Sequence, residues 1–138
     1  MNHIESITIG NNTYNCVMAS AVKQDELLSL VTQPILERAL VTARTSGAEM
    51  GDSILVPMFM AMPYDIKQRV AAILMHKVNV SGTTTSVTVN DFMGSMVEYN
   101  TLLSRLIQWN LSDFFIWLDS VVKDARPVQP VNPQSTGI

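Results

Sequence analysis

The chain has few of the side chains on which enzymes and metalloproteins usually depend, with one cysteine and two histidines in 138 residues. A single thiol, Cys16, cannot form an internal disulfide and is too few for a zinc site. Cys16 alternates with apolar residues, which predicts a small core side chain rather than a nucleophile. His3, near the N-terminus, and His76, at a helix edge, lie in no known catalytic arrangement with a carboxylate or nucleophile. We therefore expect a protein that is not an enzyme and that binds no metal and no cofactor.

Charged residues are also sparse, at 15% of the chain, and their net charge is −3. The nine basic residues are scattered along the sequence and form no basic stripe. Binding to a phosphate backbone needs such a stripe, so we expect no nucleic-acid partner. The acidic groups, Asp25-Glu26 and Asp113 with Asp119, fit helix starts and solvated faces better than an acid–base pair. The six glycines form no phosphate-binding loop.

Long apolar runs are missing as well. The longest, from Ile54 to Pro63, has ten residues, whereas a helix needs about 20 to cross a bilayer. The N-terminus lacks the basic start and apolar core of a signal peptide. Together with the single cysteine, these absences predict a location in the reducing cytosol and no membrane association.

Apolar residues, in contrast, are abundant at 47% of the chain. A chain of this length can bury a real core, and the surplus apolar surface suits binding to partners or self-association. We expect one helical domain over residues 1–126. Residues 127–138 contain three prolines and no charge, which predicts a flexible tail.

Two segments have the alternation expected of β-hairpins. Residues 4–19 alternate apolar and polar side chains on both sides of Gly10-Asn11-Asn12, which tolerate positive φ. Residues 78–89 do the same around Ser81-Gly82, with threonines that suit strands. A lone hairpin is marginal in water, so each must pack on other elements.

The first helical pattern starts after Ser20, a plausible N-cap. Pro34 cannot sit inside a helix without cost, so we expect this helix to end before it. Thr32 can cap a second helix with Pro34 in its first turn, running to about Arg44.

Three further helices are expected in the second half. An amphipathic pattern opens at Pro63 and continues to about Lys77. Asn90 caps the strongest helical stripe, and Ser112 caps the last helix. The resulting fold class is α+β and mostly helical, with about five helices and two small hairpins.

The run SILVPMFMAMPYD is the most unusual stretch, because it concentrates methionines and lacks polar side chains from Ile54 through Pro63. As a helix it would place Met58 and Met62 on one face and Met60 on another, and as a strand it would align all three methionines. Methionine is deformable, so the run suits either irregular core or a surface that binds varied apolar partners. We choose Met58, Phe59, Met60 and Met62 as the first candidates for partner binding.

Three other residues are candidates for the same role. Trp109 and Trp117 are amphipathic aromatics of the kind favoured at interfaces. Ile116 falls on the outer face of the last expected helix. An apolar side chain there does not pack in the core, so it is a candidate for contact with a partner.

Two stretches together resemble a known family. The segment SITIGNNTYNCVMASAVKQDELLSLV resembles the opening of tail assembly chaperones from long-tailed bacteriophages, a short hairpin followed by an S-A-x-x-Q-D-E-L-L helix. The segment VNDFMGSMVEYNTLLSRLIQWNLSDFFIWLD resembles the helical C-terminal half of the same group. Residues 45–62 carry no resemblance.

The resemblance implies a small, mostly helical, non-enzymatic protein of the host cytoplasm. Such chaperones coat the tape-measure protein and help bring tail-tube subunits to it, and many also exist in a frameshifted longer form. The family offers no catalytic residue to carry over. Two rival hypotheses are a structural protein of the virion or tail, and an inhibitor or adaptor that binds a host protein.

Overall fold

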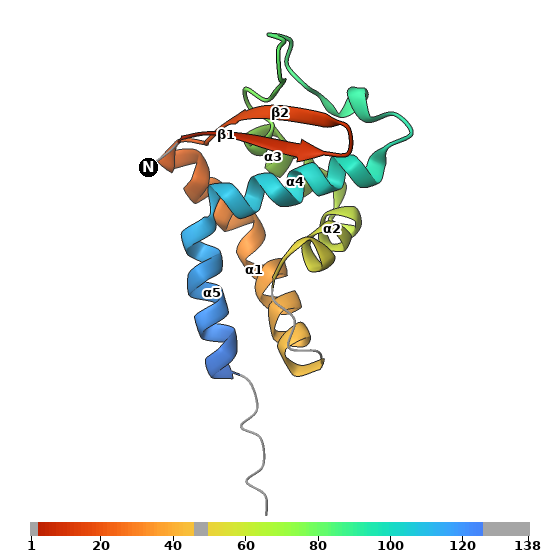
Figure 1. Ribbon diagram of the computed structural model, residues 1–138. Helices are drawn as coiled ribbons and strands as arrows, with labels where there is room; N and C mark the ends of the chain where they lie inside the picture. The colour runs from red at the N-terminus through yellow and green to blue at the C-terminus, as the bar shows by residue number, and fades with distance from the viewer. Residues whose placement is uncertain (1–2, 46–49, 126–138) are drawn as a thin grey trace, which may run out of the picture.

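The computed structural model describes residues 3–45 and 50–125. Within them lie five α-helices, a short 3-10 helix and a three-stranded antiparallel sheet, which confirms the predicted α+β, mostly helical class (Figure 1). The expected tail, 127–138, falls outside the described residues, so its flexibility and the division into domain and tail stay predictions.

The predicted N-terminal hairpin is confirmed as strands β1 (Ile4–Ile9) and β2 (Asn12–Val17). Ile7 lies opposite Tyr14, and the alternating pattern turns one face of the hairpin toward the core and the other toward solvent. On the outer face, the hydroxyls of Thr8 and Thr13 hydrogen-bond at 2.9 Å. The inner face rests on the long central helix α4, described below (Figure 1).

The hairpin turn depends on Gly10, whose φ is +57°. A glycine with positive φ at the first of the two turn residues is typical of tight hairpins. A Cβ at this position would also lie 2.9 Å from Oε1 of Glu98.

We expect Gly10→Ala to lower the free energy of unfolding by about 1 kcal/mol or more. Gly10→Asn should cost less, because asparagine tolerates this backbone region. Urea unfolding of the two variants measures the difference, and equal losses would contradict the backbone explanation.

The second expected hairpin, 78–89, is present only in part. Strand β3 (Asn79–Val80) pairs with β2, which extends the first sheet in the order β1-β2-β3. Its return is a single bridge between Asn79 and Ser86. The polar residues 81–86 are all exposed, so they have no apolar face that would hold a longer return strand against the core.

The two helices expected around Pro34 form one continuous helix, α1 (Ala21–Thr45), so the predicted break is wrong. Thr32, expected as the cap of the second helix, instead donates its hydroxyl to the backbone carbonyl four residues earlier at 2.6 Å. Proline removes one helical hydrogen bond. The fully buried Val31 and Ile35, on either side of Pro34, supply packing that offsets this loss.

The Met-rich run forms a helix, α2 (Asp52–Ala61), with Pro57 inside it. The helical alternative from the sequence is therefore the one adopted. Met58 is buried and Met62 partly buried on one face, whereas Met60 is exposed on another. The helix ends at Ala61, and Met62 is extended, as expected for a residue that precedes proline.

Other boundaries agree more closely with the sequence. The Ser20 hydroxyl oxygen accepts a hydrogen bond from the backbone N–H of Lys23 at 3.3 Å, which confirms the first cap. Helix α3 (Tyr64–Leu74) follows Pro63 as predicted, and helix α5 (Ser112–Ala125) begins at the expected serine.

The central helix begins later than expected from Asn90. A 3-10 helix, η1 (Val89–Phe92), comes first and is capped by Thr88. Gly94, with φ of +79°, then turns the chain before α4 (Met96–Asn110) starts. The pattern that suggested one helix is thus shared between two elements.

Helix α4 organises the core. It contacts α2, α3, α5, η1 and the sheet, and it crosses the molecule beneath the hairpin (Figure 1). Its fully buried apolar side chains are Leu102, Leu103, Leu106 and Ile107. α1 and α5 run alongside each other away from the sheet (Figure 1).

Candidate functional site

The methionine run splits between core and surface. Met58 and Phe59 are buried, so these two predicted partner-binding residues serve the core of the monomer, the alternative that the sequence left open. Met60 is 47% exposed on the outer side of α2. Met62 is partly buried and lines, with Met58, a recess of about 510 Å³ between α1 and the α2–α3 corner.

The other three candidates lie on different elements. Trp109 is partly buried and packs against the core at the end of α4. Ile116 is 73% and Trp117 53% exposed on α5, and the Trp117 ring lies 5.9 Å from that of Phe114 between centroids. The seven predicted residues therefore do not make one surface: two are buried, two are partly buried, and three are exposed on two helices.

A more coherent apolar surface surrounds a recess beside α3, which we name the α3 groove. It has a volume of about 670 Å³ and lies between α3, the segment 86–89 and the start of α4. Three of its side chains are large, apolar and well exposed: Tyr64 at 74%, Val89 at 47% and Met96 at 46%. The complete lining is Tyr64, Lys67, Gln68, Ala71, Ala72, Met75, His76, Lys77, Ser86, Val87, Thr88, Val89, Met96 and Tyr99.

Lys67 is the partly buried cation of this groove. Its ammonium donates a hydrogen bond to Oδ1 of Asn100 and lies 5.8 Å from the centroid of the Tyr99 ring. Burial lowers the pKa of Lys67 and raises that of Tyr99. Asn100 is itself buried and donates to the backbone carbonyl of Met96 at 2.7 Å, so the contact holds Lys67 against the first turns of α4.

Sequence reasoning missed the α3 groove because its parts come from three separate segments. Met75 and Tyr64 lie on α3 or directly after it, while Val89 and Met96 follow a polar loop. The one available signal is Met75, an apolar residue on the side of its helical pattern that also carries the polar Lys67 and Gln68. Only the packing of α3 on α4 brings these residues together.

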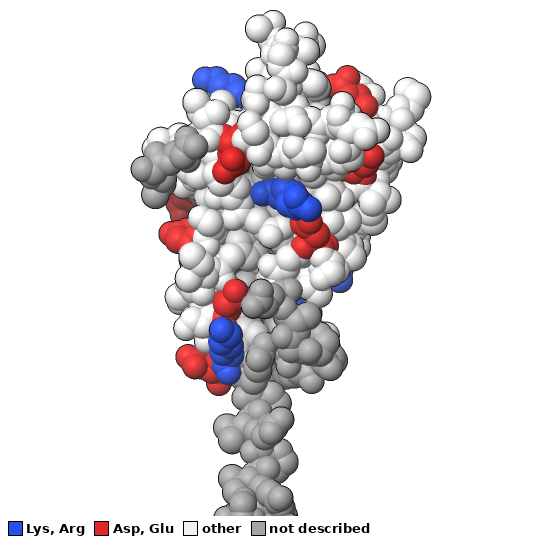
Figure 2. All heavy atoms as spheres, viewed as in Figure 1, with Lys and Arg blue, Asp and Glu red and all other residues white. Residues whose placement is uncertain are grey.

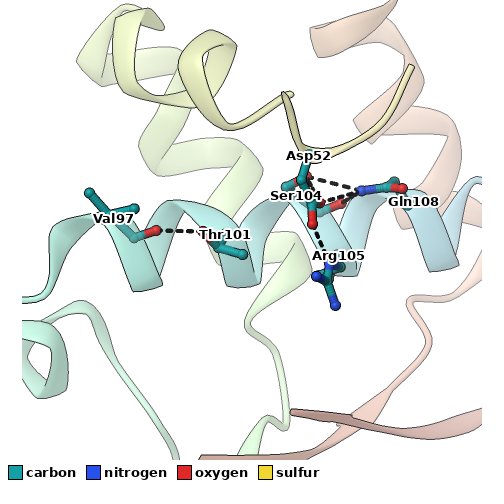
Figure 3. A network of polar contacts seen from close by, with 6 residues as sticks. All are labelled: Asp52, Val97, Thr101, Ser104, Arg105 and Gln108. Atoms are coloured by element: carbon teal, nitrogen blue, oxygen red, sulfur yellow. Dashed lines mark hydrogen bonds and ion pairs between the residues drawn. The ribbon is translucent and has the colours of Figure 1, made fainter. Parts of the chain in front are cut away.

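A second polar cluster joins α2 to α4 (Figure 3). The carboxylate of Asp52, the first residue of α2, accepts hydrogen bonds from Ser104 at 2.7 Å, from Gln108 at 2.8 Å and from Arg105. Burial raises the pKa of Asp52, but these hydrogen bonds and the Arg105 charge outweigh it and hold the pKa below its usual value. The cluster fixes the start of α2 on the central helix, and it is satisfied within the protein.

The single thiol of the chain and the possible metal ligands are further groups that could carry chemistry. Cys16 is fully buried, as predicted, and burial raises the pKa of its thiol to about 11. No group of three or more histidine, cysteine, aspartate or glutamate side chains in residues 3–45 and 50–125 is placed to hold a metal. In the same part of the chain, the helices are too short or too polar to cross a membrane.

On the face drawn in Figure 2, charged side chains are few, some of opposite sign lie next to each other, and broad uncharged surface lies between these groups. Comparison of the chain with family models, with curated proteins and with solved structures found no match.

Proposed function

We propose that the protein is a tail assembly chaperone of a long-tailed bacteriophage. It acts in the host cytoplasm, covers apolar helical segments of the tape-measure protein and helps recruit tail-tube subunits. The observation that supports binding is the α3 groove, where Tyr64, Val89 and Met96 expose apolar surface around an open recess. The resemblance of the two terminal segments to such chaperones supports the choice of partner.

The physical basis is helix-in-groove binding. An amphipathic helix buries its apolar stripe against a hydrophobic groove and leaves its polar face in water. A tape-measure protein is a long series of such helices, and before assembly their apolar faces need temporary cover. Many copies along one filament would add avidity, so each single contact need not be tight.

Co-expression of the chain with the tape-measure protein of the same phage tests this function. We expect the chain to raise the soluble fraction of the tape-measure protein, and Met96→Glu to remove most of that gain. The new charge would lie in the apolar groove, and burying it there is costly. A glutamate in the first turn of α4 is compatible with the helix, so the variant should fold.

Met60→Glu is the matched control, because Met60 is a methionine of nearly equal exposure on α2, outside the α3 groove. It should leave solubilisation unchanged. Loss of solubilisation only with Met60→Glu would place binding on the α2 surface instead. An insoluble tape-measure protein despite the chain, or the chain present in purified virions, would contradict the chaperone function and favour a host-directed or structural role.

A further inference from the structure

We infer that the α3 groove receives a helix whose apolar stripe is flanked by acidic residues, with Lys67 as the cation that pairs with them. This inference rests on the proposed chaperone function and specifies the chemistry of the segment that is bound. The charged residues around the α3 groove support this inference in addition to the apolar side chains of the groove.

The charges in the lining have one sign. Lys67 and Lys77 are the charged residues of the α3 groove, and its lining contains no aspartate or glutamate. The chain as a whole is acidic, with a net charge of −3, so the groove differs from the rest of the molecule. Of the carboxylates close to the lining in sequence, Asp91 accepts from the backbone N–H of Thr88 and Glu98 faces Gly10 at the hairpin turn. Asp65 is exposed on α3 and is not one of the lining residues.

Lys67 lacks an acidic partner in the described part of the chain. The two ion pairs there join Lys23 to Glu26 and Arg105 to Asp52. The contacts of Lys67 are instead the neutral side chains of Asn100 and Tyr99. An ammonium offers three donors, and a partly buried charge gains most from a partner that arrives with the ligand and completes its hydrogen bonds.

Other occupants fit these charges less well. Residues 127–138 of the chain itself contain no aspartate or glutamate, so they offer no acidic side chain to pair with Lys67. A second copy could present the outer face of α5, where Ile116 and Trp117 are exposed beside Asp113 and Asp124, but Lys123 on the same face would bring a cation toward Lys67. A partner helix with an acidic flank satisfies both the apolar rim and the cations.

Two synthetic helical peptides test the inference. Both carry leucines at the i, i+3, i+4 and i+7 spacing of one apolar stripe. One has glutamates along the flank and the other has lysines at the same positions. Titration by fluorescence anisotropy with the full-length chain should give a Kd about tenfold lower for the acidic peptide, a difference of the size expected for a partly desolvated charge pair. Added salt should reduce this preference.

Lys67→Glu should abolish or reverse the preference, whereas Lys123→Glu on α5 makes the same charge change away from the groove and should preserve it. Equal binding of both peptides, binding of neither, or a preference that survives Lys67→Glu would overturn the inference. Competition by a peptide of residues 127–138 would also overturn the inference, because it would show that the groove binds a segment of the same chain. A concentration-dependent dimer that Lys67→Glu dissociates would overturn it too, because the groove would then bind a second copy. A peptide preference without solubilisation of the tape-measure protein would refute only the proposed function, and the reverse result would refute only the inference.

Discussion

Replacing Phe59 by alanine should lower the free energy of unfolding by about 3–5 kcal/mol, the usual range for truncation of a buried aromatic residue. The Phe59 side chain is completely buried on α2, the helix that packs against α4. Alanine would leave a cavity at the joint between these two helices. With Pro57 already removing one hydrogen bond from α2, the helix has little of its own stability with which to compensate.

Chemical denaturation followed by circular dichroism measures this effect, and Met60→Ala provides the matched control. Met60 is the next residue along the same run, but it is 47% exposed, so its truncation should change stability by about 0.5 kcal/mol or less. Similar losses for the two variants would show that α2 does not bury the face assigned to it. The pair therefore separates core from surface within one stretch of sequence.

Replacing Asp52 by asparagine should lower the free energy of unfolding by about 1–3 kcal/mol at neutral pH, the range for hydrogen bonds to charged groups. The substitution keeps the shape of the side chain but removes the charge that Ser104, Arg105 and Gln108 stabilise. Ser104 is fully buried, so it has no access to water as a replacement partner. Asp25→Asn on the exposed side of α1 is the control and should have little effect.

The pH dependence of this loss follows from the lowered pKa of Asp52. A carboxylate with a depressed pKa in the folded state contributes stability that is fully present above its unfolded pKa of about 4. That contribution disappears as the pH falls through the lower folded value. The difference between the wild-type chain and Asp52→Asn should therefore be constant near neutrality and shrink in acid. A gap that widens in acid would contradict the network as its cause.

The elements of the fold were largely predictable, because period-2 and period-3.6 patterns survive in the sequence of the N-terminal hairpin, α3 and α5. The errors came from tertiary packing that local rules do not include. Pro34 lies inside a helix, since buried neighbours such as Val31 and Ile35 hold that helix in place. Gly94 has the opposite effect, because it separates the 3-10 helix η1 from α4 where the sequence pattern predicted one continuous helix.

The candidate site was less predictable than the fold. Composition drew attention to methionine, but it could not separate buried Met58 from exposed Met60 without knowing that α2 is a helix and which face meets α4. The α3 groove combines residues that are distant in sequence, and the role of Lys67 depends on Asn100 and Tyr99 of another helix. Such a constellation exists only after folding.

The buried position of Cys16 gives the chain a native reporter of its own opening. At neutral pH a thiol with a pKa of about 11 is almost entirely protonated, and only the thiolate reacts readily with alkylating reagents. Alkylation must therefore wait until the hairpin separates from the core that buries Cys16. Because the chain has no second cysteine, any label that appears counts those opening events alone.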